Sequence, residues 1–360
     1  MRTHHAIKSL LVLFAALAVV SLPARALEDM NVYFGNLHSH TKYSDGSGTP
    51  QEAFYWARYS AKVDFYAVTD HGEQVDPYEW WKTGQYANAA NKDGEFVAIR
   101  GFEWSHPWWG HITVWNTSSY TNAVLDYTMA HFYKWLDQNN GIAQFNHPGR
   151  EYGVFEWFAP DSRVLDNLVG GETANRKSSN NANPDAYFDW YLFALDQGWK
   201  IAPTFGKDNH SLSFPNGGRT AILARALTRA ELANAIRARR LYSTDDPNLR
   251  IYFSSGDQWM GSTITIPQYT TSVRFNVKVW DDEPITKLEL ISTGGTVLAV
   301  KIFPPNIIGW VTWYPRVYMV DSIVYAPYVF LRVTTEDTNF DMPGQPTNVA
   351  YSAPIWIQYQ

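Results

Sequence analysis

The chain of 360 residues contains no cysteine. It can therefore form no disulfide in an oxidising compartment, and the lipid-anchored N-terminus of a lipoprotein is excluded. Charge is also sparse, because charged residues make up 18% of the chain, the net charge is −6 and no long basic run occurs. This balance argues against nucleic acid as a partner. Stability is expected to come from core packing and bound metal.

The apolar run at residues 10–20 is too short to span a membrane comfortably. Arg2 and Lys8 precede it, and the small-x-small pattern Ala24-Arg25-Ala26 follows it. We predict that residues 1–26 are a signal peptide cleaved after Ala26, with an uncleaved N-terminal anchor as the alternative. A periplasmic or secreted protein with no membrane span after cleavage is expected.

Histidine is absent from the C-terminal third and patterned in the rest of the chain. His38 and His40 follow the strand-like residues 31–35, and residues two apart in a strand point to the same face. Both imidazoles can therefore bind one cation, for which Zn, Fe, Mn or Ni are suitable. Asp45, after a turn, can add a hard oxygen ligand.

The same pattern recurs along the chain, since short apolar strands repeatedly end in a histidine or a carboxylate. Strands are predicted at residues 63–69, 96–104, 110–115, 142–146, 168–172 and 201–206, and helices at residues 49–61, 132–140, 185–197 and 228–240. The candidate metal ligands are His38, His40, Asp45, His71, Glu103, His111, His147, Asp208 and His210. Nine ligands are too many for one ion and fit two or three.

These residues resemble the polymerase-and-histidinol-phosphatase (PHP) family of metallophosphoesterases. The motifs that carry the resemblance are His38-Ser39-His40, Ser44-Asp45-Gly46, Thr69-Asp70-His71, Gly101-Phe102-Glu103, Gly110-His111, Asn146-His147-Pro148 and Asp208-Asn209-His210. The resemblance covers roughly residues 31–241. It implies an α/β fold, a distorted (β/α)7 barrel with metals at the carboxyl ends of its strands.

The phrases Arg239-Arg240-Leu241-Tyr242-Ser243-Thr244, Met260-Gly261 and Ala353-Pro354-Ile355-Trp356 are similar to the CehA/McbA-like branch of that family. Position by position, the resemblance implies three metal sites. The first is formed by His38, His40, Glu103 and Asp208, the second by Glu103, His111 and His147, and the third by Asp45, His71 and His210. Two to three divalent transition metals (Zn, Mn or Fe) are expected, and the carboxylate of Asp45 favours a mixture over uniform zinc.

Beyond residue 245 the composition shifts to alternating strand-like segments separated by glycine, proline and aspartate turns. We therefore expect a barrel over residues 27–245 and a small all-β, sandwich-like domain over residues 246–360. The second domain has no histidine, and we assign it packing, lid or partner roles.

The leading hypothesis is a metal-dependent phosphoesterase that cleaves phosphodiesters with a hydroxide held between metals in a di- or trinuclear site. Catalytic roles are assigned to Glu103, Asp208, His210 and Asp70, and substrate binding to Lys207 and Arg219. The proton for the leaving group can come from Asp70, His106 or Glu172.

Two alternatives remain. The same centre can hydrolyse carboxyl or carbamoyl esters, which the aromatic residues 104–115 favour, or the barrel can be a non-catalytic metal-dependent binding module. The expected partner is a small-molecule phosphoester or aryl ester.

Overall fold

The computed structural model describes residues 30–175, 187–318 and 326–360. The predicted signal peptide, residues 1–26, lies outside the described residues, as does the start of the helix predicted from residue 185. Within the described ranges, no helix combines the length and the apolar character that a membrane crossing requires.

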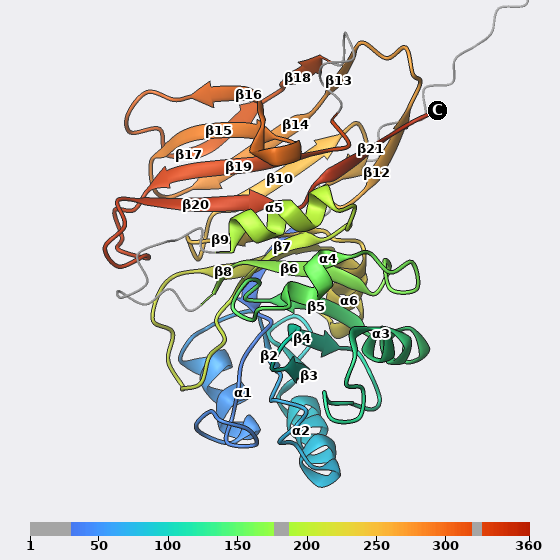
Figure 1. The fold of residues 1–360 in the computed structure, drawn as a ribbon. Coiled ribbons are helices and arrows are strands. Elements are labelled where there is room, and N and C mark those ends of the chain that lie inside the picture. The colour runs from blue at the N-terminus through green and yellow to red at the C-terminus, as the bar shows by residue number, and fades with distance from the viewer. Residues whose placement is uncertain (1–29, 176–186, 319–325) are drawn as a thin grey trace, which may run out of the picture.

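The N-terminal part is mixed α/β, with six helices among its described residues, and forms the lower half of Figure 1. Its elements are β1 (Asn31–Asn36), α1 (Pro50–Tyr59), β2 (Phe65–Val68), α2 (Pro77–Ala90), β3 (Val97–His106), β4 (Gly110–Trp115), α3 (Met129–Gln138), β5 (Ile142–Asn146), α4 (Val154–Phe158), β6 (Leu168–Asn175), α5 (Phe188–Asp196), β7 (Ala202–Gly206), β8 (Arg219–Ala224), α6 (Arg229–Arg237) and β9 (Leu241–Thr244).

The strands of this part lie in the order β8-β1-β2-β3-β4-β5-β6-β7. β1 to β3 are parallel, β5 to β7 are parallel, and β4 is antiparallel to both of its neighbours. Only three residues separate β3 from β4, which is too short for a parallel crossover, so β4 must run back along β3. The predicted α/β class is confirmed. The predicted (β/α)7 barrel is not, because the sheet is mixed and extends beyond this part of the chain.

Two helices begin with the same hydrogen-bonding device. The Thr49 side chain accepts from the Glu52 amide while the Glu52 carboxylate accepts from the Thr49 amide, which starts α1 where the sequence predicts it. Asp76 and Glu79 make the same pair of bonds at the start of α2, which the sequence analysis did not predict. The Asp76-Pro77-x-x pattern ending at Glu79 is a sequence signal that identifies this helix.

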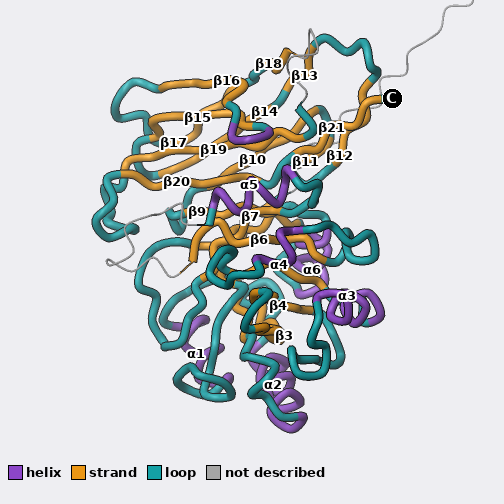
Figure 2. Tube along the Cα trace, in the orientation of Figure 1, coloured by secondary structure: helices purple, strands orange, loops and turns teal. Residues whose placement is uncertain are grey.

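The C-terminal part is all β and contains two facing sheets (Figures 1 and 2). Its described elements are β10 (Arg250–Ser255), β11 (Gln258–Trp259), β12 (Thr263–Ile266), β13 (Ser272–Arg274), β14 (Asn276–Asp281), β15 (Ile285–Ile291), the 3-10 turn η2 (Thr293–Gly295), β16 (Val297–Ile302), β17 (Gly309–Trp313), β18 (Arg316–Tyr318), β19 (Tyr328–Glu336), β20 (Thr347–Ser352) and β21 (Ile355–Tyr359).

One sheet runs through both parts of the molecule. β9 pairs with β8 on one side and with β20 on the other, and β19, β15 and β16 continue from there. The second sheet, β11-β10-β14-β17, packs against it through buried side chains such as Phe253, Val279 and Leu331. This is the sandwich-like arrangement expected from the sequence.

A buried phenol helps to hold the link between β9 and β10, residues 245–249. The hydroxyl of Tyr242 donates to the carbonyl of Leu249 at 2.5 Å and accepts from the amide of Ile251 at 3.3 Å. Tyr242 is fully buried, so water cannot replace either bond.

Tyr242→Phe is therefore expected to lower the free energy of unfolding by about 1–3 kcal/mol, because two buried backbone groups lose their partner. Urea denaturation followed by fluorescence measures this change. The matched control is Tyr269→Phe, whose side chain is 85% exposed and whose effect should stay within about 0.5 kcal/mol. Equal effects of the two substitutions would contradict the assignment.

Candidate metal centre

The direction of the strands explains why the predicted ligands gather at one end of the sheet. β1, β2, β5 and β7 run the same way, and the ligands that follow them are His38, His40, His71, His147, Asp208 and His210. Glu103 lies within β3. Because β4 is antiparallel to β3, its first residues reach the same end, and His111 pairs with Ser105.

Glu103 is the central residue of the cluster. Its Oε1 lies 3.2 Å from Nε2 of His38, 3.3 Å from Nδ1 of His111 and 3.4 Å from Nε2 of His147. Its Oε2 lies 2.9 Å from Nδ1 of His71 and 3.6 Å from Nε2 of His40. The two oxygens of one buried carboxylate therefore face different groups of imidazoles.

A first group of ligand atoms lies beside Oε1 and Oε2. Nε2 of His38 and Nε2 of His40 are 3.1 Å apart, and Oδ1 of Asp208 lies 3.5 Å and 3.1 Å from them. Two imidazole nitrogens and two carboxylates are thus aimed at one point, which is the arrangement of a transition-metal site.

A second group surrounds Asp45. Its Oδ1 lies 3.0 Å from Nε2 of His210, 3.6 Å from Nε2 of His71 and 3.7 Å from Nδ1 of His40. One ligand atom from each of these four residues lies within 4.8 Å of the others. The structure thus brings all nine predicted ligands together.

The electrostatics of the centre fit cation binding. Burial raises the pKa of Glu103, but the charge of His111 and His38 outweighs burial and holds this pKa well below its usual range. Burial lowers the pKa of His147, but the Glu103 and Glu151 carboxylates raise it to about 9. Neither ring nitrogen of His147 has a hydrogen-bond partner, although both are buried. Buried polar atoms without partners are rare, and a metal ion would satisfy these.

Two ligands occupy backbone conformations that side chains rarely adopt. His147 has φ of 28° and Asp208 has φ of 45°. Such residues persist only where the surrounding structure fixes them, and they concentrate at functional sites. Asp208 therefore does not continue β7 as an extended strand.

Glu172 holds two of the ligands, His38 and His147, in place. Its Oε1 lies 2.8 Å from Nδ1 of His38, and its Oε2 accepts from the amide of His147 at 2.7 Å. Gln144 and Asn175 also donate to it. Glu172 therefore orients two ligands and is fully buried, so its contacts are those of a positioning residue.

Asp70 contacts the turn that follows the ligand His40. Its carboxylate accepts from the amide and hydroxyl of Thr41 and from the hydroxyl of Ser44. The Ser44 hydroxyl lies 3.4 Å from Nδ1 of His40. These contacts fix the turn after His40, and the catalytic role assigned to Asp70 stays a prediction.

Lys207 and Arg219 contact a neighbouring loop. Nζ of Lys207 donates to the carbonyl and side-chain oxygens of Asn216, and Nη1 of Arg219 donates to the carbonyls of Gly217 and Gly218. These bonds hold the loop before β8, and the substrate binding assigned to both residues stays a prediction.

His106, a candidate proton donor, is buried rather than exposed. Its Nδ1 accepts from the amides of Trp108 and Trp109, and its ring stacks on Trp104. Burial lowers its pKa. These contacts hold the turn between β3 and β4.

The sequence analysis missed two charged residues at the centre, Arg150 and Glu151. Nη2 of Arg150 lies 3.1 Å from Nδ1 of His111, and its Nη1 lies 3.6 Å from Oδ2 of Asp208. The Glu151 carboxylate lies 3.8 Å from a ring nitrogen of both His111 and His147. Both residues follow the His147-Pro148-Gly149 turn, and that position directly after a strand end is the signal that identifies them.

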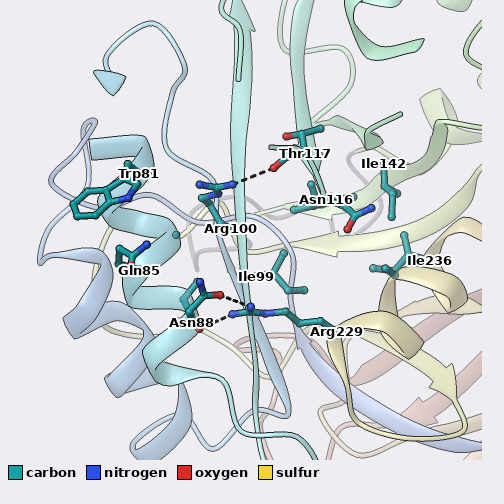
Figure 3. Close-up of a pocket in the computed structure, with 14 residues that line it drawn as sticks. Trp81, Gln85, Asn88, Ile99, Arg100, Asn116, Thr117, Ile142, Arg229 and Ile236 are labelled. Carbon is teal, nitrogen blue, oxygen red and sulfur yellow. Dashed lines mark hydrogen bonds between the residues drawn. The ribbon is translucent and has the colours of Figure 1, made fainter. Parts of the chain in front are cut away.

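A cavity of about 240 Å³ lies elsewhere on the same sheet (Figure 3). Ile99 and Arg100 line it at the beginning of β3, and Asn116 lines it just after β4. The strand directions place it at the end of the sheet opposite Glu103. Its two guanidinium groups, those of Arg100 and Arg229, donate to backbone carbonyls and Asn88, so we assign the chemistry to the histidine cluster.

No protein-family model matches the chain. An uncharacterized protein of Chlamydia pneumoniae is 22% identical over 385 residues, which cover 94% of this chain and 59% of that protein. The chain thus spans less than two thirds of that relative.

Solved structures with a similar fold include the following two. One is a two-domain protein of Bacteroides vulgatus that contains a predicted PHP-like metal-dependent phosphoesterase, with a TM-score of 0.49, 15% identity and coverage of 91% of this chain and 96% of that chain. Another is endonuclease Q in complex with a 27-mer duplex that carries an abasic lesion, with a TM-score of 0.40, 12% identity and coverage of 57% of each chain. We assign no family at this level of similarity.

One expectation from the sequence needs correction. The mildly negative charge argued against nucleic acid as a partner, but the similar folds include endonuclease Q bound to DNA. Net charge averages over the whole surface and does not describe the surface around one site. The net charge is therefore no evidence against a nucleic-acid partner.

Glu172→Gln is expected to weaken metal binding by about 10–100-fold, because the neutral amide no longer orients His38. Chelator competition, with metal content measured by mass spectrometry, tests this. Glu156→Gln, a change at an exposed glutamate, serves as the control and should bind metal like the unaltered protein. Unchanged affinity in Glu172→Gln would show that this carboxylate does not position the ligands.

Proposed function

We propose that this chain is a metal-dependent hydrolase of phosphoesters, most suited to phosphodiesters, and a PHP metallohydrolase of the CehA/McbA-like branch that is exported after signal cleavage. The observation that carries the proposal is the position of Glu103. Its two carboxylate oxygens face separate groups of imidazoles, five in all, that come from four strands or strand ends.

The residues fit two or three divalent metals. His38, His40, Glu103 and Asp208 would hold the first, Glu103, His111 and His147 the second, and Asp45, His71 and His210 the third. Zn, Mn and Fe suit these imidazole-rich sets. Bound there, the metals would supply Lewis-acid activation of water and would neutralise charge on a phosphoryl group.

The solvent exposure of the residues increases from the base of the site to its rim. Glu103, His38 and His147 are buried at its base, where they exclude water. Asp45 and Arg150 have 46% and 43% of their side chains exposed and form its rim. The guanidinium of Arg150 beside Asp208 is the group best placed to donate hydrogen bonds to a non-bridging phosphoryl oxygen.

Hydrolysis of aryl esters is the second candidate, and one observation favours it. The exposed rings of Trp108 and Tyr152 stack with centroids 5.9 Å apart, and Tyr152 follows Glu151 directly. This aromatic surface adjoins the rim and can receive an aryl leaving group.

The proposal is tested on the unaltered protein and Glu103→Gln. We expect two to three transition metals per chain, and at least one metal fewer in the variant. Turnover of a bis-aryl phosphate should fall by about 10³-fold or more in the variant, because a ligand shared between metal sites is lost. Chelation of the unaltered protein should cause a similar loss, because it removes the metals. An aryl phosphate, an aryl acetate and a duplex with an abasic site complete the substrate panel.

The outcomes separate the alternatives. Glu156→Gln should retain metal and activity. Cleavage of the aryl acetate alone would favour the ester hydrolase, and cleavage of the duplex would identify a nucleic-acid substrate. Full metal content without turnover of any substrate would favour a binding module. A metal-free protein, or activity indifferent to Glu103, would refute the proposal.

Arg150→Met should lower kcat/KM for the bis-aryl phosphate by about 10²-fold or more while metal content stays unchanged, because a charged donor to the phosphoryl group is lost. Arg150→Lys should recover part of this loss. Steady-state kinetics and metal analysis of both variants provide the test, and wild-type kinetics in Arg150→Met would exclude a role at the phosphoryl group.

A further inference from the structure

A second set of acidic side chains lies far from the histidine cluster in sequence, where three connections of the β part meet. Asp246 lies between β9 and β10, Glu283 between β14 and β15, and Asp341 between β19 and β20. One oxygen from each of the three lies within 4.8 Å of the others. Asp281, the last residue of β14, lies beside Asp246.

Three of these groups are fully buried, and Asp341 is partly buried with Arg219 as a positive neighbour. Asp246, Asp281 and Glu283 have no exposed surface. In the described part of the chain, none of the three, nor Asp341, forms an ion pair with lysine, arginine or histidine. Buried carboxylates without a counter-charge are costly, since each ion must leave water beside others of the same sign. Burial and the neighbouring carboxylates accordingly raise the pKa of Asp246.

Several oxygens of the set have no hydrogen-bond partner. Oδ1 of Asp246 accepts from the amides of Asn248 and Leu249, whereas its Oδ2 accepts nothing. Oδ2 of Asp281 and Oδ2 of Asp341 also have none. These three oxygens without a hydrogen-bond partner belong to carboxylates that lie close together.

Asn348 adds a neutral oxygen to the set. Its Nδ2 donates to Oε2 of Glu283 at 3.0 Å, so its side chain is directed at the carboxylates. Its Oδ1 has no partner although the residue is 1% exposed. The buried amide thus places an unused carbonyl oxygen at the same place.

We propose that Asp246, Asp281, Glu283, Asp341 and Asn348 form a calcium site at the junction of the two parts of the molecule. The ligand set contains only oxygen, which selects a hard cation over the transition metals suited to imidazoles. Ca²⁺ accepts six to eight carboxylate and carbonyl oxygens in irregular geometry, which fits ligands from three connections and a strand. This part of the chain contains no histidine, so the histidine pattern predicted no metal here.

The site lies at the contact between the two parts, where a bound cation would link them. The carbonyl of Asp341 accepts from the amide of Gly217, in the loop that leads into β8. Oε1 of Glu283 accepts from the amides of Thr338 and Asn339 and so holds the β19–β20 connection. Calcium would therefore stabilise the contact between this connection and the loop before β8.

The test uses the full chain with its histidine cluster loaded with Zn²⁺ or Mn²⁺, titrated with CaCl2 in a calorimeter. We expect one Ca²⁺ per chain and a rise in the thermal midpoint of about 5 °C at a hundredfold excess over Kd. Mg²⁺ should bind at least about tenfold more weakly because it demands a tighter octahedral geometry.

Asp246→Asn and Asp281→Asn should each weaken Ca²⁺ binding at least about 100-fold and leave transition-metal content unchanged. Without calcium, their thermal midpoints should equal or exceed that of the unaltered protein, because a buried like charge is removed. Asp257→Asn, in the exposed β10–β11 turn, is the control and should bind Ca²⁺ normally.

Three results would overturn the proposal. They are no calcium uptake by the unaltered protein, uptake that both substitutions leave unchanged, and equal binding of Mg²⁺. Since the test reads calcium and stability rather than hydrolysis, its failure is separate from any failure of the proposed enzyme function.

Discussion

The buried carboxylate of Glu103 is the constraint on which the site depends. Five histidines approach its two oxygens, and the antiparallel return of β4 is what brings His111 to the same end of the sheet as ligands that follow parallel strands. A negative charge at this depth is stabilised by the surrounding imidazoles and by the side-chain amide of Asn146, which donates to Oε1 of Glu103 at 2.6 Å. The strand order and the ligand set are therefore two aspects of one arrangement.

Much of the site could be predicted from the sequence because strand periodicity and residue chemistry are local signals. His38 and His40 stand two apart after an apolar strand, His147 follows a similar strand, and Glu103 lies near the end of another. The contacts of Lys207 and Arg219 with the loop before β8 could not be predicted this way, since a charged side chain near a ligand in sequence can turn toward a loop. The direction of a side chain depends on tertiary contacts.

The fold was predictable at the level of elements more than of topology. The capping pattern at Thr49 locates α1, and the same pattern at Asp76 locates α2 once it is noticed. The mixed direction of the strands was not accessible, because apolar runs carry no information on parallel or antiparallel pairing. The acidic set around Asp246 was equally hidden, since its members lie in connections up to about a hundred residues apart and meet only when two sheets stack.

The pairing of β9 with both β8 and β20 has a mechanical consequence. A ladder of backbone hydrogen bonds crosses the junction between the α/β part and the β part. The two parts therefore cannot rotate apart about a hinge without breaking these hydrogen bonds. Access to the histidine cluster is then independent of a hinge motion between the two parts. The same continuity makes the two parts a single cooperative unit, whose loss of order in one half propagates through the shared sheet to the other.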